Sequence, residues 1–387
     1  MTYIYLSTAI FIGGIFIVFW LHNQYHLDIV VEPTPPPTVA PLISVCVPAR
    51  NEARNIRACV AYILAQDYPN FEIIVLDDRS TDATPELLHQ LSAQGDRLKV
   101  IRGSDLPKGW AGKPHALFQA SATAGGTWLC FVDADTFLSP PALSSCYAKA
   151  IETNADMFTI MTFQILGSFW EKVVMPIVMT ALSVGFSPRK VNDPNSRDAI
   201  ANGQFILIKR SVYDAIGGHE SVKDQIVEDK AISERVKWSG HRLIVANGYP
   251  VARTRMDTSL PEMWEGWTKN IYLGLSDQPS LMMLGVFGAF ILMVAALVLP
   301  LWPLLGLFWY SQGGGWLALT VILESLVLWA IVIQARARVA IGMQISSWYA
   351  LTLPLGAAVF GAMMFASAWK VLSGQGVMWK GRKYTQK

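Results

Sequence analysis

Hydrophobic residues follow two different patterns along this chain. Long uncharged runs occupy both ends: residues 3–21 and 339–369 carry no charge, and residues 281–335 carry only Glu324. Nineteen helical residues span about 28 Å, close to the thickness of a bilayer core. Between these runs, short apolar segments alternate with polar and amphipathic ones. The pattern predicts a central α/β domain flanked by transmembrane helices.

The first run is interpreted as an N-terminal transmembrane anchor over residues 1–24, followed by a proline-rich linker over 25–41. A secretory signal peptide is the alternative, and it would need a basic start and a small-residue cleavage site. Here the start is uncharged and the bulky sequence FWLHNQY ends the run, so a retained anchor is favoured.

Residues 281–370 are predicted to form three transmembrane helices, near 281–302, 316–334 and 347–369. The sequences PLWP, SQGGG and RAR separate them, and tryptophans and tyrosines near their ends suit a membrane interface. If Met1 lies outside, the central domain faces the cytoplasm and the basic tail, 371–387, lies outside, against the positive-inside rule. A re-entrant 281–310 segment would reverse the tail, so its side stays open.

The central region is expected to adopt a mainly parallel α/β fold. Apolar, β-rich runs at 42–47, 71–76, 98–101 and 127–132 are predicted strands, with helices expected near 55–66, 84–93 and 114–124. Strands that alternate with helices form parallel sheets covered on both faces. Ligands of such sheets bind beyond the carboxyl ends of the strands.

Polar clusters follow three of these strands: PARNE (48–52), DDRSTD (77–82) and DADT (133–136). Each cluster alone could be a turn or a helix cap. Because the fold brings the three to one edge, together they indicate a binding site. Asp133 and Asp135 flank one small residue, and such carboxylates can bind a hard divalent cation that keeps waters and accepts phosphate oxygens.

Charge and cysteine content narrow the possible partners. The formal net charge is only +2, which gives no strong field for a polyanion, so no nucleic acid is expected as a partner. The four cysteines lack metal-type spacing. Cys46 and Cys130 lie in apolar strand-like runs and are expected to be buried thiols, which suits a reducing cytoplasmic domain.

An ordered set of motifs carries a family resemblance: VCVPARNEARNI, IIVLDDRSTDAT, GWAGKPHAL, FVDADT, ANGQFILIKRSVYDAIGGHE and VEDKAISERVK. The set resembles inverting family 2 glycosyltransferases of the GT-A fold, over roughly residues 42–275. The most similar members are membrane-bound carotenoid and hopene-associated glycosyltransferases and, more distantly, ceramide glucosyltransferases. The resemblance implies a GT-A domain over 42–280, a nucleotide-sugar donor, usually a UDP-sugar, and Mg²⁺ or Mn²⁺.

The resemblance also implies a role for individual residues. Asp135 would be the main metal ligand, with Asp133 near the metal and the ribose. Asp229, in the pair Glu228–Asp229, would be the general base, although a carboxylate at a helix N-terminus is also an ordinary cap and this alternative is serious for Glu228. The other expected contacts are Pro48, Asn51 and Glu52 along the nucleotide, Asp77 and Asp78 at the base or ribose, Lys113 at the diphosphate or sugar, and Gly203 and Gln204 at the floor of the sugar pocket.

One segment departs from the family pattern. Processive members carry a Gln/Arg-x-x-Arg-Trp motif where this chain has EMWEGWTKNIY, residues 262–272. Trp267 could supply an aromatic wall for the acceptor and Lys269 a cation for the diphosphate. Tryptophans here could equally be interfacial anchors. The departure argues against polymer synthesis.

The segment near 168–188 is expected to be an interfacial helix beside the active site. Its uncharged part, 173–188, is short for a membrane span and contains Pro176. A buried core helix is the alternative. Together these features predict a multi-pass enzyme of the cytoplasmic membrane that moves a sugar to a hydroxyl of a lipid such as a carotenoid or hopanoid. The alternatives are an exopolysaccharide or polyprenyl-linked sugar transferase and a non-catalytic nucleotide-sugar-binding scaffold.

Overall fold

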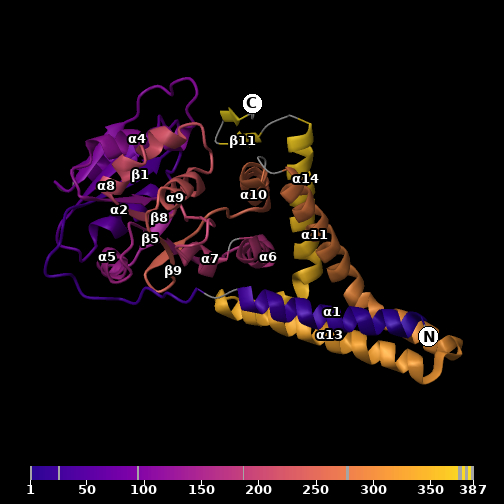
Figure 1. Ribbon diagram of the computed structural model, residues 1–387. Helices are drawn as coiled ribbons and strands as arrows, with labels where there is room; N and C mark the ends of the chain where they lie inside the picture. Colours follow the sequence, from indigo (N-terminus) through magenta and orange to yellow (C-terminus); the bar gives the residue numbers. More distant parts are fainter. Residues whose placement is uncertain are drawn as a thin grey trace. The chain divides into compact units, whose positions relative to one another are not determined.

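A computed structural model describes residues 2–24, 27–93, 96–185, 187–275, 279–373, 377–379 and 382–384 (Figure 1). The chain divides into two compact units. The α/β unit comprises residues 26–165 and 186–256, and the helical unit comprises 1–25, 166–185 and 257–387. Of the predicted basic tail, residues 374–376, 380–381 and 385–387 lie outside the described residues.

The α/β unit is built on a seven-stranded sheet with the order β3-β2-β1-β4-β8-β6-β9. Its strands are β1 (Ile43–Ala49), β2 (Phe71–Asp77), β3 (Leu98–Arg102), β4 (Trp128–Val132), β6 (Met157–Met161), β8 (Phe205–Lys209) and β9 (Leu243–Asn247). Only β8 runs against its neighbours: it pairs antiparallel with β4 and β6, whereas the remaining pairs are parallel. The predicted mainly parallel α/β fold is therefore confirmed. The first and last residues of each predicted strand lie within two residues of those of an observed strand.

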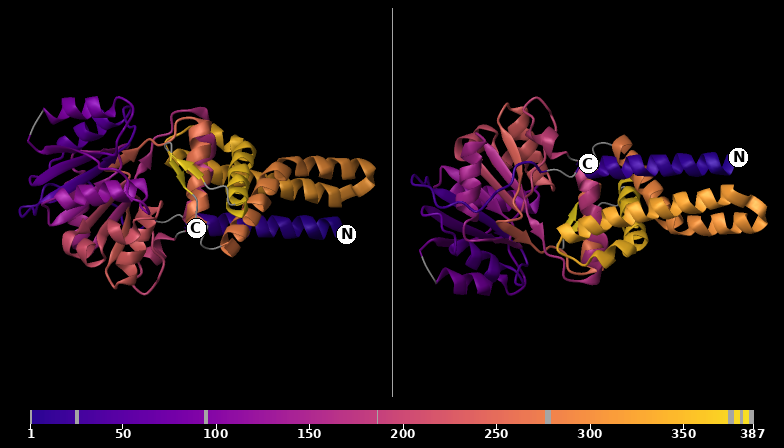
Figure 2. Two further views of the ribbon diagram at one scale, coloured as in Figure 1. Left: turned by 90° about the horizontal axis from the view of Figure 1, so that it is seen from above. Right: turned by 90° about the horizontal axis from the view of Figure 1, so that it is seen from below.

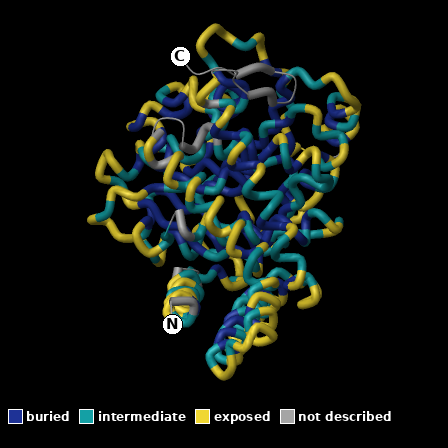
Figure 3. Tube along the Cα trace, turned by 90° about the vertical axis from the view of Figure 1, so that its right-hand side faces the viewer, coloured by how far each residue is buried: buried dark blue, intermediate teal, exposed yellow. Residues whose placement is uncertain are grey.

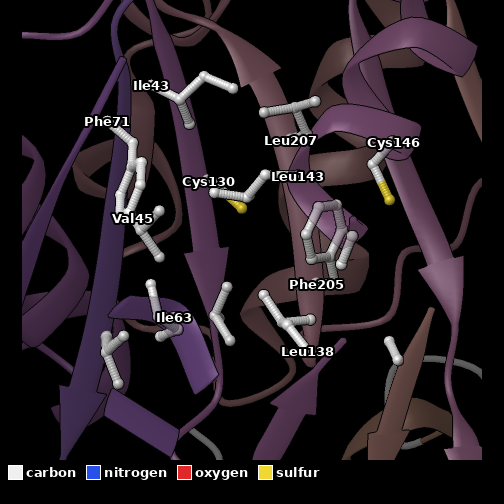
Figure 4. Close-up of a cluster of buried hydrophobic side chains, with 14 of the residues drawn as sticks. Ile43, Val45, Ile63, Phe71, Cys130, Leu138, Leu143, Cys146, Phe205 and Leu207 are labelled. Atoms are coloured by element: carbon white, nitrogen blue, oxygen red, sulfur yellow. The ribbon is translucent and has the colours of Figure 1, made fainter. Parts of the chain in front are cut away.

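Helices cover both faces of this sheet because successive strand residues point to opposite sides. Val45 and Val47 pack in a cluster with α2 (Ile56–Leu64), α3 (Thr84–Ser92) and α5 (Ala142–Glu152). Cys46 packs on the other face, which is covered by α4 (Gly112–Thr123), α7 (Pro188–Asn192), α8 (Arg210–Ala215) and α9 (Glu228–Trp238). Figure 4 shows part of the first cluster, where Ile43, Phe71, Cys130 and Leu207 gather from neighbouring strands.

All four cysteines are buried thiols, including Cys46 and Cys130, for which burial was predicted. Burial raises the pKa of Cys46 to about 12 and raises the pKa values of Cys59, Cys130 and Cys146 as well. Such thiols stay protonated near neutral pH and act as small apolar side chains.

A second sheet of three short strands extends the α/β unit: β5 (Thr136–Leu138), β7 (Phe163–Gln164) and β10 (Ala252–Thr254), in the order β5-β10-β7. β5 begins three residues after Asp133, because Thr136 N donates to Asp133 O and turns the chain there. The turn holds the Asp-Ala-Asp segment between the two sheets.

The helical unit contains α1 (Thr2–Gln24), α6 (Phe169–Gly185), α10 (Leu260–Leu275), α11 (Pro279–Val298), α12 (Trp302–Trp309), α13 (Gly315–Gly342), η4 (Ser347–Thr352) and α14 (Leu353–Leu372), and a two-stranded ribbon of β11 (Val377–Trp379) and β12 (Arg382–Tyr384). Within the described residues, three helical stretches are long and apolar enough to cross a membrane: 4–21, 283–342 and 347–370. Large apolar side chains on α1, α12 and α13 are exposed, and these helices are coloured largely exposed or intermediate in Figure 3.

Two of the three predicted breaks interrupt the helices. At the start of PLWP (300–303), Leu299–Leu301 form a short 3-10 turn, η2, between α11 and α12. The SQGGG segment reverses the chain between α12 and α13, where Gly313 and Gly315 adopt φ values of 87° and 55° that favour glycine (Figure 2). The predicted break at residues 336–338 does not interrupt the helix: α13 continues through Arg336 and Arg338 to Gly342, since arginine is a good helix former.

The N-terminal helix α1 packs along α13 (Figure 2). Ser7 Oγ and Thr8 Oγ1 donate to the two carboxylate oxygens of Glu324, at 2.6 and 2.8 Å. At Gly14 a Cβ atom would lie 2.8 Å from a methyl carbon of Leu328, so the absence of a side chain permits the close approach. The only acidic residue of the long apolar region therefore ties α1 to α13 by side-chain hydrogen bonds.

The segment predicted as an interfacial helix forms α6 and groups with the apolar helices. Val173, Val174 and Val178 pack with Met263 of α10 and Met363 of α14. At the start of α6, the buried Glu171 carboxylate accepts hydrogen bonds from the backbone N–H groups of Gly167 and Ser168, which caps the helix.

Candidate functional site

The polar clusters predicted from the sequence meet at one edge of the large sheet. β1 ends at Ala49, β2 at Asp77 and β4 at Val132, and all three are parallel. β8 runs the other way, with Phe205 opposite Val132, so the start of β8 lies at the same edge. The segments after β1, β2 and β4 are therefore joined there by Gly203 and Gln204, which precede β8.

Lys113 forms the centre of a charged cluster. Its Nζ lies 2.7 Å from Asp133 Oδ1 and 2.7 Å from Glu228 Oε1. The first turn of α4 supplies the lysine, the end of β4 supplies Asp133, and the first turn of α9 supplies Glu228. Three segments distant in the sequence thus hold one cation between two carboxylates.

The protonation of this cluster is set by burial and by neighbouring charge. Burial would lower the pKa of Lys113, but Asp133, Glu228 and Asp229 outweigh it and hold this pKa well above its usual value. The Glu228 side chain is only 5% exposed, and burial raises its pKa to about 7, although Lys113 acts in the opposite direction. Lys113 therefore stays charged at neutral pH, while Glu228 can take up or release a proton.

Asp229 is held by backbone amides. Its Oδ2 accepts a hydrogen bond from Gly203 N at 2.9 Å, and its Oδ1 accepts one from Lys230 N at 2.8 Å. A Cβ atom at Gly203 would lie 2.9 Å from Lys113 Nζ and 3.1 Å from Asp229 Oδ2. Glycine at position 203 thus lets the lysine and the carboxylate approach the same backbone segment.

The segments after β1 and β2 are joined by hydrogen bonds. Asn51 adopts φ 53°, its N donates to Ser80 Oγ, and its Oδ1 accepts from Thr81 N. Asp77 Oδ1 accepts from Ser80 N, so this carboxylate orders the turn after β2. Asp77 and Asp78 are both buried, whereas Pro48, in β1, and Glu52 are partly exposed.

Arg50 also belongs to this part of the site, although no role for it was predicted from the sequence. Its Nη1 donates to Asp78 O at 2.6 Å and lies 3.9 Å from Asp78 Oδ2. Its position in the PARNE cluster was the available signal. The arginine fixes the backbone next to a residue that was expected to contact the nucleotide.

Gln204 lies in a buried polar network. Its Oε1 accepts hydrogen bonds from Thr162 Oγ1, from Asn202 Nδ2 at 3.2 Å and from Gln164 Nε2 at 3.2 Å. Asn202 Nδ2 also donates to Ile160 O, which ties the segment before β8 to β6. The network fixes the position of the segment that precedes β8 at this edge of the sheet. Asn202 was not predicted individually, although it lies in the quoted ANGQF motif.

The carboxylates Asp133 and Asp135 have the donor chemistry expected for a hard divalent cation. Within the described ranges there is no group of three or more His, Cys, Asp or Glu side chains that could hold a metal. Two carboxylates do not make a closed structural zinc site. They suit an ion such as Mg²⁺ or Mn²⁺, which keeps waters and takes further oxygens from a phosphate ligand. The residues present therefore fit the predicted metal.

Trp267 and Lys269 lie in the helical unit, on α10, and are both largely buried. Trp267 packs in the apolar cluster of α6, α10 and α14. The site described above is made by the α/β unit alone.

Comparison with known proteins identifies the α/β part of the chain. Residues 44–217 match the family model described as glycosyl transferase family 2. This segment therefore matches a family 2 glycosyltransferase domain. The chain is also 28% identical over 351 residues to 4,4'-diaponeurosporenoate glycosyltransferases of Staphylococcus aureus strains RF122 and MRSA252, covering 89% of this chain and 88% of each relative.

A solved structure resembles the glycosyltransferase over nearly its whole length. It is a mannosyltransferase from Pyrobaculum calidifontis, determined in complex with GDP-Man and Mn²⁺. It matches with a TM-score of 0.54 and 18% sequence identity, over 95% of this chain and 97% of the other. The predictions of a GT-A fold and of a glycosyltransferase are confirmed.

Proposed function

We propose that this glycosyltransferase moves a hexose from a nucleotide sugar to an acceptor group on a membrane lipid, with inversion at the anomeric carbon. The observation that carries the proposal is the meeting of Lys113, Asp133, Glu228 and Asp229 at one sheet edge, in a chain that also contains long apolar helices. The proposed donor is a UDP-hexose. A GDP-sugar is the natural second donor to test, because the structural relative was solved with GDP-Man.

Asp229 is proposed as the general base for a hydroxyl acceptor. The two backbone N–H groups fix its carboxylate and leave lone pairs of both oxygens for a substrate proton. A hydroxyl that attacks the anomeric carbon must lose its proton in the transition state, and a positioned carboxylate can accept it. Attack from the face opposite the leaving diphosphate inverts the configuration, so a UDP-α-sugar would give a β-glycoside.

Asp135 and Asp133 are proposed to hold Mg²⁺ or Mn²⁺. When bound, the ion supplies Lewis-acid stabilisation for the negative charge that grows on the leaving diphosphate. Lys113 supplies a second positive charge beside Asp133. Pro48, Asn51, Glu52, Asp77 and Asp78 are proposed to bind the base and ribose, and Gly203 and Gln204 to form the floor of the sugar pocket. Trp267 is proposed to contact the acceptor, and Lys269 is proposed to contact the diphosphate.

A carboxylate is the second candidate acceptor group, since the relatives are named for a carotenoid carboxylate, 4,4'-diaponeurosporenoate. A carboxylic acid is ionised near neutral pH and has no proton to give up when it attacks. Transfer to it would yield a glycosyl ester and would depend little on a base. If the acceptor is a hydroxyl, Asp229→Asn should therefore lose most of its activity. If the acceptor is a carboxylate, Asp229→Asn should lose little.

The enzyme is proposed to be a multi-pass protein of the cytoplasmic membrane with its catalytic unit in the cytoplasm. Four buried thiols suit a reducing compartment, and the apolar helices suit a bilayer. The same location would give the enzyme both a soluble nucleotide sugar and a lipid acceptor.

Donor turnover tests the proposal directly. The full chain is purified in detergent and supplied with Mn²⁺ or Mg²⁺, a panel of UDP- and GDP-sugars, and lipid extracts that contain hydroxylated or carboxylated carotenoids. Nucleotide release and lipid-linked sugar are followed by mass spectrometry. Wild-type turnover that Asp135→Ala abolishes supports the proposal. Donor binding without turnover on any lipid would favour the scaffold alternative.

A further inference from the structure

The helical unit buries an arginine whose hydrogen-bonding capacity is mostly unused. Arg336, on α13, is only 7% exposed. Its Nη2 donates to the backbone oxygen of Lys172 on α6, at 3.3 Å. Among the residues that the structure describes, its Nε and Nη1 have no hydrogen-bond partner. Within the described ranges, one long hydrogen bond to a carbonyl is thus the only one that this buried guanidinium makes.

A guanidinium in this position needs an anion. Arginine keeps its charge at every physiological pH, so it cannot escape burial by losing a proton. Burying such a charge without a partner is strongly unfavourable. Its planar fork of N–H groups matches the spacing of phosphate oxygens, which makes phosphate the preferred bidentate ligand.

The position of Arg336 along α13 indicates where the anion would come from. The helix has 28 residues. At 1.5 Å per residue it is about 42 Å long, roughly 12 Å more than the hydrocarbon core of a bilayer. The surplus corresponds to about eight residues. If the other end of α13 lies at the far boundary of the core, Arg336 lies at the level of the lipid headgroups.

The neighbourhood of Arg336 has the composition of a membrane interface. Arg338, two residues further on, is exposed, and so is Trp348 of η4, which packs against α13. Lys172 Nζ lies 5.7 Å from the centre of the Tyr349 ring, which places a second cation at the junction of α6 and η4. Basic residues between membrane helices, flanked by aromatic ones, are typical of sites for acidic headgroups.

We propose that Arg336 and Lys172 bind the phosphate of an anionic membrane lipid at the junction of α6, α13 and η4. The lipid phosphate would accept hydrogen bonds from Nε and Nη1 of Arg336, and the flexible Lys172 side chain would move to admit it and pair with its remaining charge. A free phosphate ion has the same chemistry and is the other source to test. The site lies within the helical unit and is independent of the sugar-transfer chemistry.

Thermal unfolding of the full chain tests the proposal. The protein is kept in a neutral detergent and titrated with short-chain phosphatidylglycerol, with phosphatidylcholine of the same chain length, or with inorganic phosphate. At a lipid concentration of roughly 100 Kd, mass action raises the Tm by about 5–10 °C. We expect this rise with phosphatidylglycerol, and at most a small rise with phosphatidylcholine or phosphate.

Arg336→Gln should abolish the rise, and Arg338→Gln should keep it. Arg338→Gln is the matched control because it removes the same charge from an exposed position on the same helix. Without lipid, Arg336→Met should have a Tm equal to or above the wild type, since an unpaired buried charge is replaced by an apolar side chain. With phosphatidylglycerol present, the wild type should have the higher Tm of the two.

A measurement on the unmodified protein covers the case in which a variant does not fold. Native mass spectrometry after detergent exchange should find one phosphatidylglycerol retained per chain. An equal rise with free phosphate would refute a lipid source. No rise with any anion, no retained lipid, or the same loss in Arg338→Gln would overturn the site.

Discussion

The buried carboxyl of Glu228 should make the stability of the α/β unit depend on pH, and Glu228→Gln isolates this effect. Its pKa rises from 4.5 to about 7 in the folded protein. At 1.36 kcal/mol per pKa unit, the difference is worth about 3 kcal/mol. Between these values the folded state binds a proton that the unfolded state has lost. The stabilisation by the protonated carboxyl is therefore complete below pH 4.5 and is lost as the pH rises through 7.

Glutamine has the shape of the protonated acid and does not titrate. We therefore expect wild type to lose stability relative to Glu228→Gln between pH 4.5 and 8. A domain of this size changes its Tm by about 2–4 °C per kcal/mol, so the Tm difference should change by about 6–12 °C over this range. Thermal unfolding in detergent, with a chelator present, measures it. Glu234→Gln, on the same helix and in an ion pair with Lys230, is the control.

Parallel Tm curves for wild type and Glu228→Gln would refute this reasoning. They would mean that Lys113 compensates the buried charge completely and that burial has no net effect. A divergence of the opposite sign, with wild type gaining stability as the pH rises, would mean that the ion pair with Lys113 dominates.

Three further predictions concern other parts of the chain. Asp229→Asn should lower kcat on a hydroxyl acceptor by about 10²–10⁴-fold, measured as lipid-linked sugar, and an unchanged rate on that acceptor would exclude Asp229 as the base. Gly203→Ala should lower kcat by about 10–100-fold, because its methyl group would displace Lys113 and Asp229, and it should leave the thermal transition nearly unchanged. Glu324→Leu should destabilise the packing of α1 on α13 by about 1–2 kcal/mol, seen as weaker disulfide cross-linking between introduced cysteines, while Glu324→Gln, which can still accept, should lose less.

The sequence predicted the first four strands of the large sheet well because each of them is an apolar run between helices. The four predicted strands correspond to β1, β2, β3 and β4. The motifs after them also indicated the edge where Asp133, Lys113 and Glu228 meet. Periodicity alone could not show that β8 runs antiparallel, since strand direction depends on pairing between residues far apart in the sequence. The same limit applies to the small sheet of β5, β10 and β7, whose strands have only two or three residues.

Contacts between side chains that are far apart in the chain also could not be predicted from a single sequence. Lys113 was expected to contact a diphosphate, but nothing in its motif indicated that it would join Asp133 to Glu228. The continuation of α13 past Arg336 was missed for another reason. A charged residue commonly ends a membrane span, but it does not have to end the helix, and α13 runs on to Gly342.

The interleaving of the two units along the chain has a consequence for folding. The α/β unit consists of residues 26–165 and 186–256, and α6 lies in the interval between them. Synthesis therefore delivers β1 to β7 first, then a helix destined for the apolar helices, and only afterwards β8, which pairs with β4 and β6 at the centre of the sheet. The large sheet is complete only after α6 has been synthesised, because β8 and β9 follow α6 in the sequence. A shortened protein that ends before α10 would still carry α6 without Met263 and Met363, its apolar partners. Such a fragment would expose Val173, Val174 and Val178 and should aggregate, so the sugar-transferring unit is not separable from its helices by a single cut.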